Sequence, residues 1–297
     1  MARIQSAEKT FVFNLNPSND ATIAEDARYI DCGQVYSLVN RFSARQGFAW
    51  VVDSIEIGVQ GGGAFEAAIF RLPHHWPCVN AWEKTMRHWL EQQDEALDAA
   101  GLESRVCRYR DFKIFYDAVH ANGGTALNLL PNGFLAVAPP TGGYDWNASQ
   151  VVVPNDGGVA GNTQEYFLHM LGDDNAGANP SKGMVKAYAD SRTRPFNDDP
   201  NIVDVPSGGL FGEMEDVGET MDEITLNAVG SNDQPPYVID VDTADEFYPG
   251  GANQGWLDGE FVDILAVNAG QNYNTDTTGG FIAPAGLIKL RYNANRS

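Results

Sequence analysis

Cysteine is scarce in this chain of 297 residues, which has only Cys32, Cys78 and Cys107. An odd, widely spaced set without a Cys-x-x-Cys motif excludes a disulfide framework and favours free thiols. Long apolar runs are also missing, because no stretch of about 18 apolar residues is present to form a transmembrane helix. Residues 1–15 lack the apolar segment of a signal peptide. We therefore expect a protein with no export signal and no membrane segment.

Motifs for nucleophilic and phosphate chemistry are absent as well. The chain has no Gly-x-Ser-x-Gly nucleophile elbow, no Walker loop and no Gly-x-Gly-x-x-Gly turn before a helix. His74, His75, Cys78 and His88 lack the ligand spacing of a zinc site, and we interpret them as surface or packed side chains. Forty acidic residues bring carboxylates together by chance, so a carboxylate-pair hydrolase is only a minor alternative. The sequence predicts that the protein is not an enzyme.

Positive charge is missing from a long part of the chain. Residues 195–288 contain no Lys or Arg, and the net charge is −21 with a pI near 4.4. This acidity disfavours the whole surface as a binder of nucleic acid and favours repulsion between copies. Asp240, Asp242, Asp245 and Glu246 could supply oxygen ligands to a structural Ca²⁺, although the EF-hand pattern is absent. A solvated acidic loop is the alternative interpretation of these four residues.

Short apolar segments separated by turns predict an all-β fold. Glycine is frequent, at 31 residues, and turns rich in Gly, Asn, Asp and Pro separate about ten strand candidates. Two of these candidates, 48–59 and 65–72, flank three consecutive glycines and predict a β-hairpin. The remaining strand candidates are residues 9–15, 111–119, 133–138, 149–153, 164–171, 223–229, 260–267 and 282–292. We expect a single domain over residues 1–297.

One or two helices interrupt this β pattern. Apolar side chains recur with a period near 3.6 after Asn80, which is a candidate N-cap with Glu83 three residues later. Gly101 follows the last periodic residue and predicts the end of this helix. A second, shorter helix is expected over residues 182–190.

A run of cations and aromatic rings gives the most specific functional signal. Arginine and lysine side chains can bind phosphates while rings stack on bases, a combination suited to single-stranded nucleic acid. The alternative is an ordinary strand whose rings are buried and whose cations pair with acidic residues. The predicted nucleic-acid-binding residues are Arg105, Arg108, Arg110 and Lys113.

Four segments of the chain form a pattern when they are taken together in order. They are YIDCGQVYSLVNRFSARQGFAWVV (29–52), NAWEKTMRHW (80–89), RYRDFKIFYDAVH (108–120) and YPGGANQ (248–254). In this order and at these spacings they resemble the capsid proteins of small circular single-stranded DNA viruses of the environmental, replication-initiator-encoding kind. The resemblance implies a jelly-roll β-sandwich with long loops, which self-assembles into an icosahedral shell of sixty subunits or a small multiple. It also implies enclosed single-stranded DNA and a location in the virion.

The first residues depart from that family. Many of its members begin with an Arg-rich arm, whereas residues 1–20 contain only Arg3 and Lys9 as bases. Neutralisation of a genome would therefore fall to the predicted nucleic-acid-binding residues or to counterions. Tryptophans are expected to anchor the core or the subunit interfaces, and the candidates are Trp76, Trp82, Trp89 and Trp256. A calcium-assisted carbohydrate-binding β-sandwich module is the alternative function.

Overall fold

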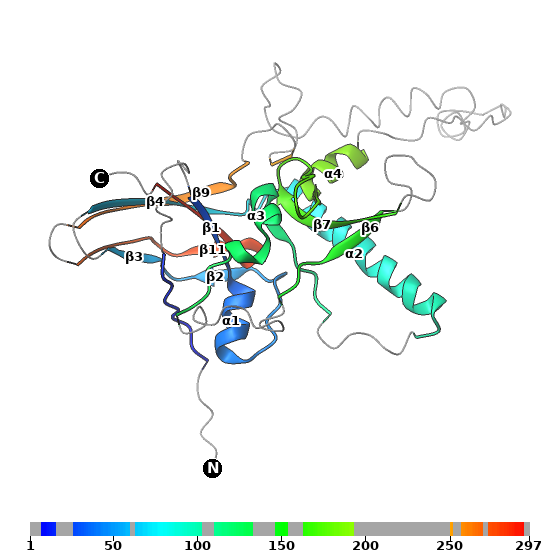
Figure 1. Cartoon of the computed structure of the whole chain (residues 1–297), viewed down its shortest axis with the longest axis horizontal. Coiled ribbons are helices and arrows are strands. Elements are labelled where there is room, and N and C mark those ends of the chain that lie inside the picture. The colour runs from blue at the N-terminus through cyan, green and yellow to red at the C-terminus, as the bar shows by residue number, and fades with distance from the viewer. Residues whose placement is uncertain are drawn as a thin grey trace, which may run out of the picture.

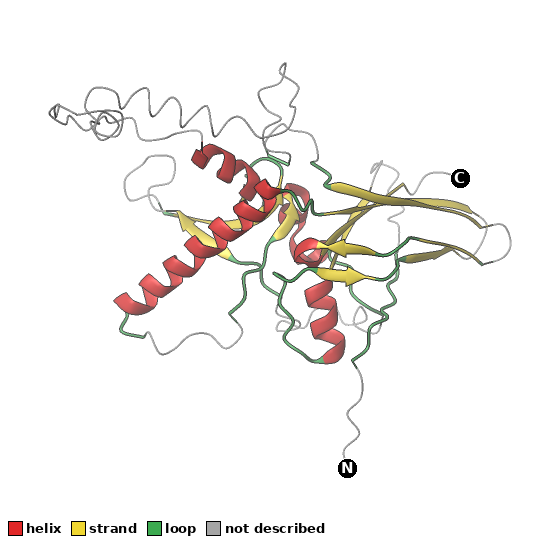
Figure 2. Ribbon diagram, turned by 180° about the vertical axis from the view of Figure 1, so that it is seen from behind, coloured by secondary structure: helices red, strands yellow, loops and turns green. Residues whose placement is uncertain are grey.

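The computed structural model describes residues 7–15, 26–59, 63–102, 110–132, 146–153, 163–192, 250–251, 257–269 and 273–293. Long antiparallel strands gather on one side of the molecule, and two helices with a smaller sheet gather on the other (Figure 1). Figure 2 shows the same division from behind, with the long strands extending away from the helices.

Sheet 1 is a four-stranded antiparallel sheet with the order β1-β12-β4-β9. Its strands are β1 (Asp26–Asp31), β12 (Leu287–Asn293), β4 (Gly63–Arg71) and β9 (Glu260–Ala269). The register shifts between Ile69 and Phe70, where β4 pairs with β9 through a bulge. Alternating apolar residues run along these strands, as expected for a sheet that buries one face.

A two-stranded ribbon forms a second layer. It consists of β2 (Trp50–Val52) paired with β11 (Phe281–Ala283), and of β3 (Glu56–Val59) paired with β10 (Asn274–Thr277). The two pairs are joined where the Thr278 amide donates to the Ile55 carbonyl at 3.0 Å and the Ile55 amide donates to the Thr278 hydroxyl at 3.1 Å. They therefore form one bent ribbon.

The pairing follows a single rule. Taken along the chain, β1, β2, β3 and β4 pair with β12, β11, β10 and β9 in that order, and every pair is antiparallel. Residues 26–71 and 260–293 are thus the two arms of one long hairpin. The arms are rolled up, because β12 also pairs with β4 inside sheet 1.

Sheet 1 and the ribbon share one apolar core. Alternate residues of sheet 1, such as Ile69, Leu265 and Leu290, are buried against Ile57 and Ala283 of the ribbon. Each fully buried aliphatic side chain of this kind contributes about 1.5–3 kcal/mol. The expectation of a β-rich fold with mostly antiparallel sheets and some helices is confirmed.

A second apolar core joins a third sheet to the helices. This sheet contains β5 (Phe115–Asp117), β6 (Gln150–Val153), β7 (Gln164–Leu171) and β8 (Ser181–Gly183). The helices α2 (Trp76–Ala99) and α4 (Met184–Arg192) supply buried side chains to the same core. The described residues also contain α1 (Cys32–Asn40), α3 (Ala118–Gly123) and the 3₁₀ turns η1 (Gly124–Leu127) and η3 (Pro284–Gly286).

Several sequence expectations were wrong. The described residues contain four α-helices instead of one or two, and β7 pairs in parallel with both β5 and β8. The segments around the three glycines do not form a hairpin, because β3 pairs with β10 while β4 pairs with β12 and β9. Residues 9–15 contain only a bridge from Phe13 to Pro131. The strand candidates 133–138 and 223–229 lie outside the described residues.

Helix α2 begins before the predicted N-cap and ends as predicted. Pro77 lies in its first turn, where a missing amide hydrogen costs nothing. Asn80 lies inside the helix, whose N-cap position is His75, and its side chain donates to the Tyr188 hydroxyl at 3.2 Å. At the other end Gly101 has a φ of 64° and donates to the Asp98 carbonyl, and Leu102 donates to the Leu97 carbonyl. These two bonds form a Schellman motif, which satisfies the last carbonyls of the helix.

No helix of the described part of the chain is long and apolar enough to cross a membrane.

Candidate functional site

Arg110 is already engaged within the molecule. Its guanidinium makes an ion pair with Asp94 at 2.9 Å, donates to the Leu90 carbonyl at 3.2 Å and lies 5.8 Å from the ring centre of Trp89. All three partners belong to α2. The Arg110 side chain therefore links the segment before β5 to this helix. Arg105 and Arg108 lie outside the described residues.

Lys113 lies over an aromatic ring, at 4.6 Å from its amino group to the ring centre of Trp146. The neighbouring rings Phe112, Phe115 and Tyr116 are buried. In this described segment the rings are thus core residues and the cations have intramolecular partners. A role of these residues in binding nucleic acid stays a prediction.

The other predicted sites divide between described and undescribed residues. Trp89 is buried in the core of the helical part, Trp82 packs against that core, and Trp76 is partly exposed beside Tyr188. Trp256 and the candidate Ca²⁺ ligands Asp240, Asp242, Asp245 and Glu246 lie outside the described residues. Within the described ranges, no three His, Cys, Asp or Glu side chains are placed to hold a metal ion.

A buried ion pair joins sheet 1 to the helical part. The amino group of Lys289 on β12 lies 2.7 Å from carboxylate oxygens of both Asp117 and Asp258. Asp117 also accepts bonds from the Tyr29 hydroxyl and the His120 amide, each at 2.8 Å. Burial alone would lower the pKa of Lys289, but the two carboxylates hold it above its ordinary value. Lys289 is therefore charged at neutral pH, in a position that faces away from the apolar core shared by sheet 1 and the ribbon.

Asp31 forms a second polar centre next to this ion pair. Its carboxylate accepts hydrogen bonds from the Gln34 amide (3.1 Å), the Gln46 side chain (3.0 Å) and the Trp146 indole (2.7 Å). Burial raises the pKa of Asp31 to about 6, although these bonds oppose the rise. The carboxylate also caps α1, so it holds together the start of a helix and two loops.

His120 connects the two centres. Its Nδ1 accepts from the Tyr116 amide at 3.1 Å, so its Nε2 carries the hydrogen and donates to Asn128 at 2.6 Å. Asn128 in turn donates to the side chain of Gln34 at 2.8 Å. The imidazole stacks on Tyr29 with 4.0 Å between ring centres. Burial lowers the pKa of His120 to about 4, so the ring is neutral.

Asp31 and His120 should affect stability in opposite directions as the pH falls. Between pH 6 and 4 folded Asp31 binds a proton that the unfolded chain does not, so its contribution rises by about 2–3 kcal/mol. Between pH 6.5 and 4 the unfolded chain protonates His120 first, so that contribution falls. We expect D31N to lose stability more steeply than the wild type when urea unfolding is compared at pH 7, 6 and 5. Identical pH dependence of the two proteins would contradict this prediction.

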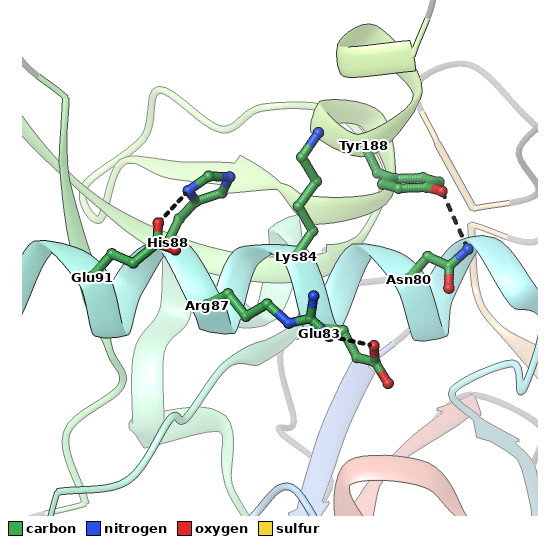
Figure 3. Close-up of a pocket in the computed structure, with 7 residues that line it drawn as sticks. All are labelled: Asn80, Glu83, Lys84, Arg87, His88, Glu91 and Tyr188. Carbon is green, nitrogen blue, oxygen red and sulfur yellow. Dashed lines mark hydrogen bonds and ion pairs between the residues drawn. The ribbon is translucent and has the colours of Figure 1, made fainter.

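A shallow groove of about 390 Å³ lies between α2 and α4 (Figure 3). Its side chains are mixed in charge and partly bonded to one another, as in the Glu83–Arg87 and His88–Glu91 contacts at 3.4 and 3.1 Å. Lys84 donates to Ser191 at 2.7 Å and lies near the Tyr188 ring. With each cation next to a carboxylate or hydroxyl, the groove holds no concentrated charge for an anionic ligand.

Two pairs of exposed apolar side chains stand out, one on the ribbon and one on sheet 1. On the ribbon, Val51 (81% exposed) and Ile282 (50% exposed) are directly paired across β2 and β11. On sheet 1, Phe261 (53%) and Ile264 (46%) are exposed on β9, and Phe261 contacts Phe70 edge to face. Clustered exposed apolar side chains often mark protein–protein contacts.

Sequence reasoning missed the polar network. Lys289 did carry a signal, because a lysine between Ile288 and Leu290 interrupts an apolar strand that is buried on its other face. Asp31 and Gln34 carried the local pattern of a helix N-cap, three residues apart. Their bonds to Trp146 and Asn128 carried no signal, because they join segments far apart in the chain. Among the described residues the network lines only a cavity of about 10 Å³, which is too small for a substrate. In comparisons with protein-family models, curated proteins and solved structures, nothing matched this chain.

Proposed function

We propose that the chain is the coat subunit of a small icosahedral shell that encloses single-stranded DNA in a virion. The observation that carries the proposal is the rolled hairpin, in which four consecutive segments of one arm pair in reverse order with four of the other. A jelly roll is such a hairpin wrapped into two facing sheets, and it is an architecture of viral capsid domains. After β4, which belongs to the fourth pair, the chain continues into α2 of the helical part.

The surface charge and the exposed apolar pairs support assembly. Copies with a net charge of −21 repel one another, so their contacts need apolar surface or screening. The Val51–Ile282 pair offers such surface on the ribbon. It lies on the outer side, away from the core that sheet 1 and the ribbon share.

The four predicted cations are not expected to contribute equally to DNA binding. Arg110 and Lys113 are engaged with α2 and Trp146, so we expect Arg105 and Arg108 to contribute more to genome neutralisation. Counterions would neutralise the remaining phosphates. An R105A/R108A variant should form shells with less nucleic acid than those of wild type.

Electron microscopy of the purified protein, with its absorbance ratio at 260 and 280 nm, tests the proposal. Closed round particles of uniform size are the expected result, and a raised ratio would identify enclosed nucleic acid. A monodisperse monomer at every salt and Ca²⁺ concentration would contradict the shell. Binding of a glycan by that monomer only in the presence of Ca²⁺ would instead favour a carbohydrate-binding module.

We expect a V51K/I282K variant to remain folded and to lose assembly. Lysine at these exposed positions costs the subunit little, within about 0.5 kcal/mol, but places four charges in each contact between two such patches. Light scattering and electron microscopy would measure particle formation, and thermal unfolding would measure the fold. Normal particles from this variant would exclude the Val51–Ile282 pair as a subunit contact.

A further inference from the structure

Strand β9 lies at the edge of sheet 1, with β4 on one side and no strand of the described residues on the other. It is ten residues long and its sequence, EFVDILAVNA, is rich in residues that favour strands. A long edge of this kind offers unpaired amide and carbonyl groups to another strand.

Two amides of this edge are bound by carboxylates. The Ile264 amide donates to Asp263 at 2.8 Å, and the Ala266 amide donates to Asp276 of β10 at 3.0 Å. Because backbone groups alternate in direction along a strand, Ile264 and Ala266 both turn their amides away from β4. The two carboxylates therefore occupy the positions that carbonyl oxygens of an added strand would take.

The face of the same strand is apolar. Phe261 and Ile264 are about half exposed, and Ala266 beside them is also exposed. The other half of this sheet face, over β1 and β12, is covered by the chain itself, where Tyr29 and Lys289 are buried. An added strand at β9 would extend the sheet and bring its side chains beside this uncovered apolar half.

We propose that the β9 edge is complementary to the β9 edge of a second copy of this chain, and that Asp263 and Asp276 keep it closed, so that the two edges pair only when the carboxylates release the Ile264 and Ala266 amides. An antiparallel strand pair has a two-fold axis, so one edge is complementary to itself. With the axis at Leu265, Ile264 pairs with Ala266 of the second copy through amide–carbonyl bonds in both directions. The occupant is thus an identical strand, which supplies the backbone acceptors and the apolar residues together.

The test separates the hydrogen bond from the charge. D263A/D276A removes both carboxylates and exposes both amides, whereas D263N/D276N removes the charges but keeps an oxygen that can accept each bond. We expect the alanine variant alone to show an intermolecular β band by infrared spectroscopy and about a tenfold or larger rise in its association constant by sedimentation. Ile264→Lys, added to the alanine variant, should abolish the gain, because an edge lysine blocks strand addition.

Three results would overturn the proposal. They are unchanged association of a folded alanine variant, equal association of the asparagine variant, and association that persists after Ile264→Lys is added. If the double alanine variant does not fold, D263A alone exposes the Ile264 amide and should give a weaker band of the same kind. These readouts compare variants with wild type, so they are independent of whether the wild type forms shells.

Discussion

Replacement of Lys289 by methionine should lower the free energy of unfolding by about 3–5 kcal/mol, the usual cost of breaking a buried ion pair from one side. Lys289 lies between Asp117 and Asp258, and its side chain is only 7% exposed. Methionine fills a similar volume but leaves the buried carboxylate of Asp117 without its cation. Urea unfolding at neutral pH would measure the loss.

Lys182 provides the matched control. It pairs with Asp174 at a similar distance, 3.0 Å, but both side chains are about one-third exposed. K182M should therefore cost no more than about 1 kcal/mol. In a K289M/D117N double variant part of the loss should be recovered, because the unpaired charge is gone. A loss of under about 1 kcal/mol for K289M would show that water reaches Asp117 and that the pair is not a buried one.

Trp89→Ala should cost about 3–5 kcal/mol of subunit stability, because a large buried ring is lost and a cavity remains. Trp89 is 6% exposed, and its ring centre lies 5.4 Å from that of Phe112. The substitution also removes the ring under the Arg110 guanidinium. Chemical unfolding of the separate subunit would measure the effect.

Trp76→Ala is the comparison on the same helix. Trp76 is 37% exposed and contacts Tyr188 edge to face. A smaller loss of stability is expected there, with any large effect appearing in association between copies. Equal losses for both variants would contradict the assignment of Trp89 to the core and Trp76 to the surface.

Local patterns predicted elements well wherever the structure depends on local contacts. The predicted strand 164–171 matches β7, and the predicted strand 260–267 lies within β9. Gly101 ends α2 as predicted, because a positive φ at this position is a requirement that glycine meets most easily. Each of these features can be recognised from a few neighbouring residues.

Pairing could not be predicted in the same way. The three glycines indicated a hairpin, but β3 and β4 each pair with strands some 200 residues further along the chain. The predicted strand 48–59 is two strands, because the ribbon bends between Val52 and Glu56. No strand or helix was predicted over residues 26–40, yet Asp31 ends β1 and caps α1. The polar network escaped prediction for the same reason, because it joins distant segments.

The rolled hairpin also sets an order of events during synthesis. Strand β1 pairs in sheet 1 only with β12, which leaves the ribosome about 260 residues later. Sheet 1 therefore cannot be completed before β12 has been synthesised. Pairing between strands so far apart in the chain also favours slow folding. The elements of the helical part, from α2 to α4, all lie within residues 76–192, so they can form before the second arm has been synthesised. A nascent chain would then hold an incomplete sheet until β12 emerges, a period in which chaperone binding could protect its open strands.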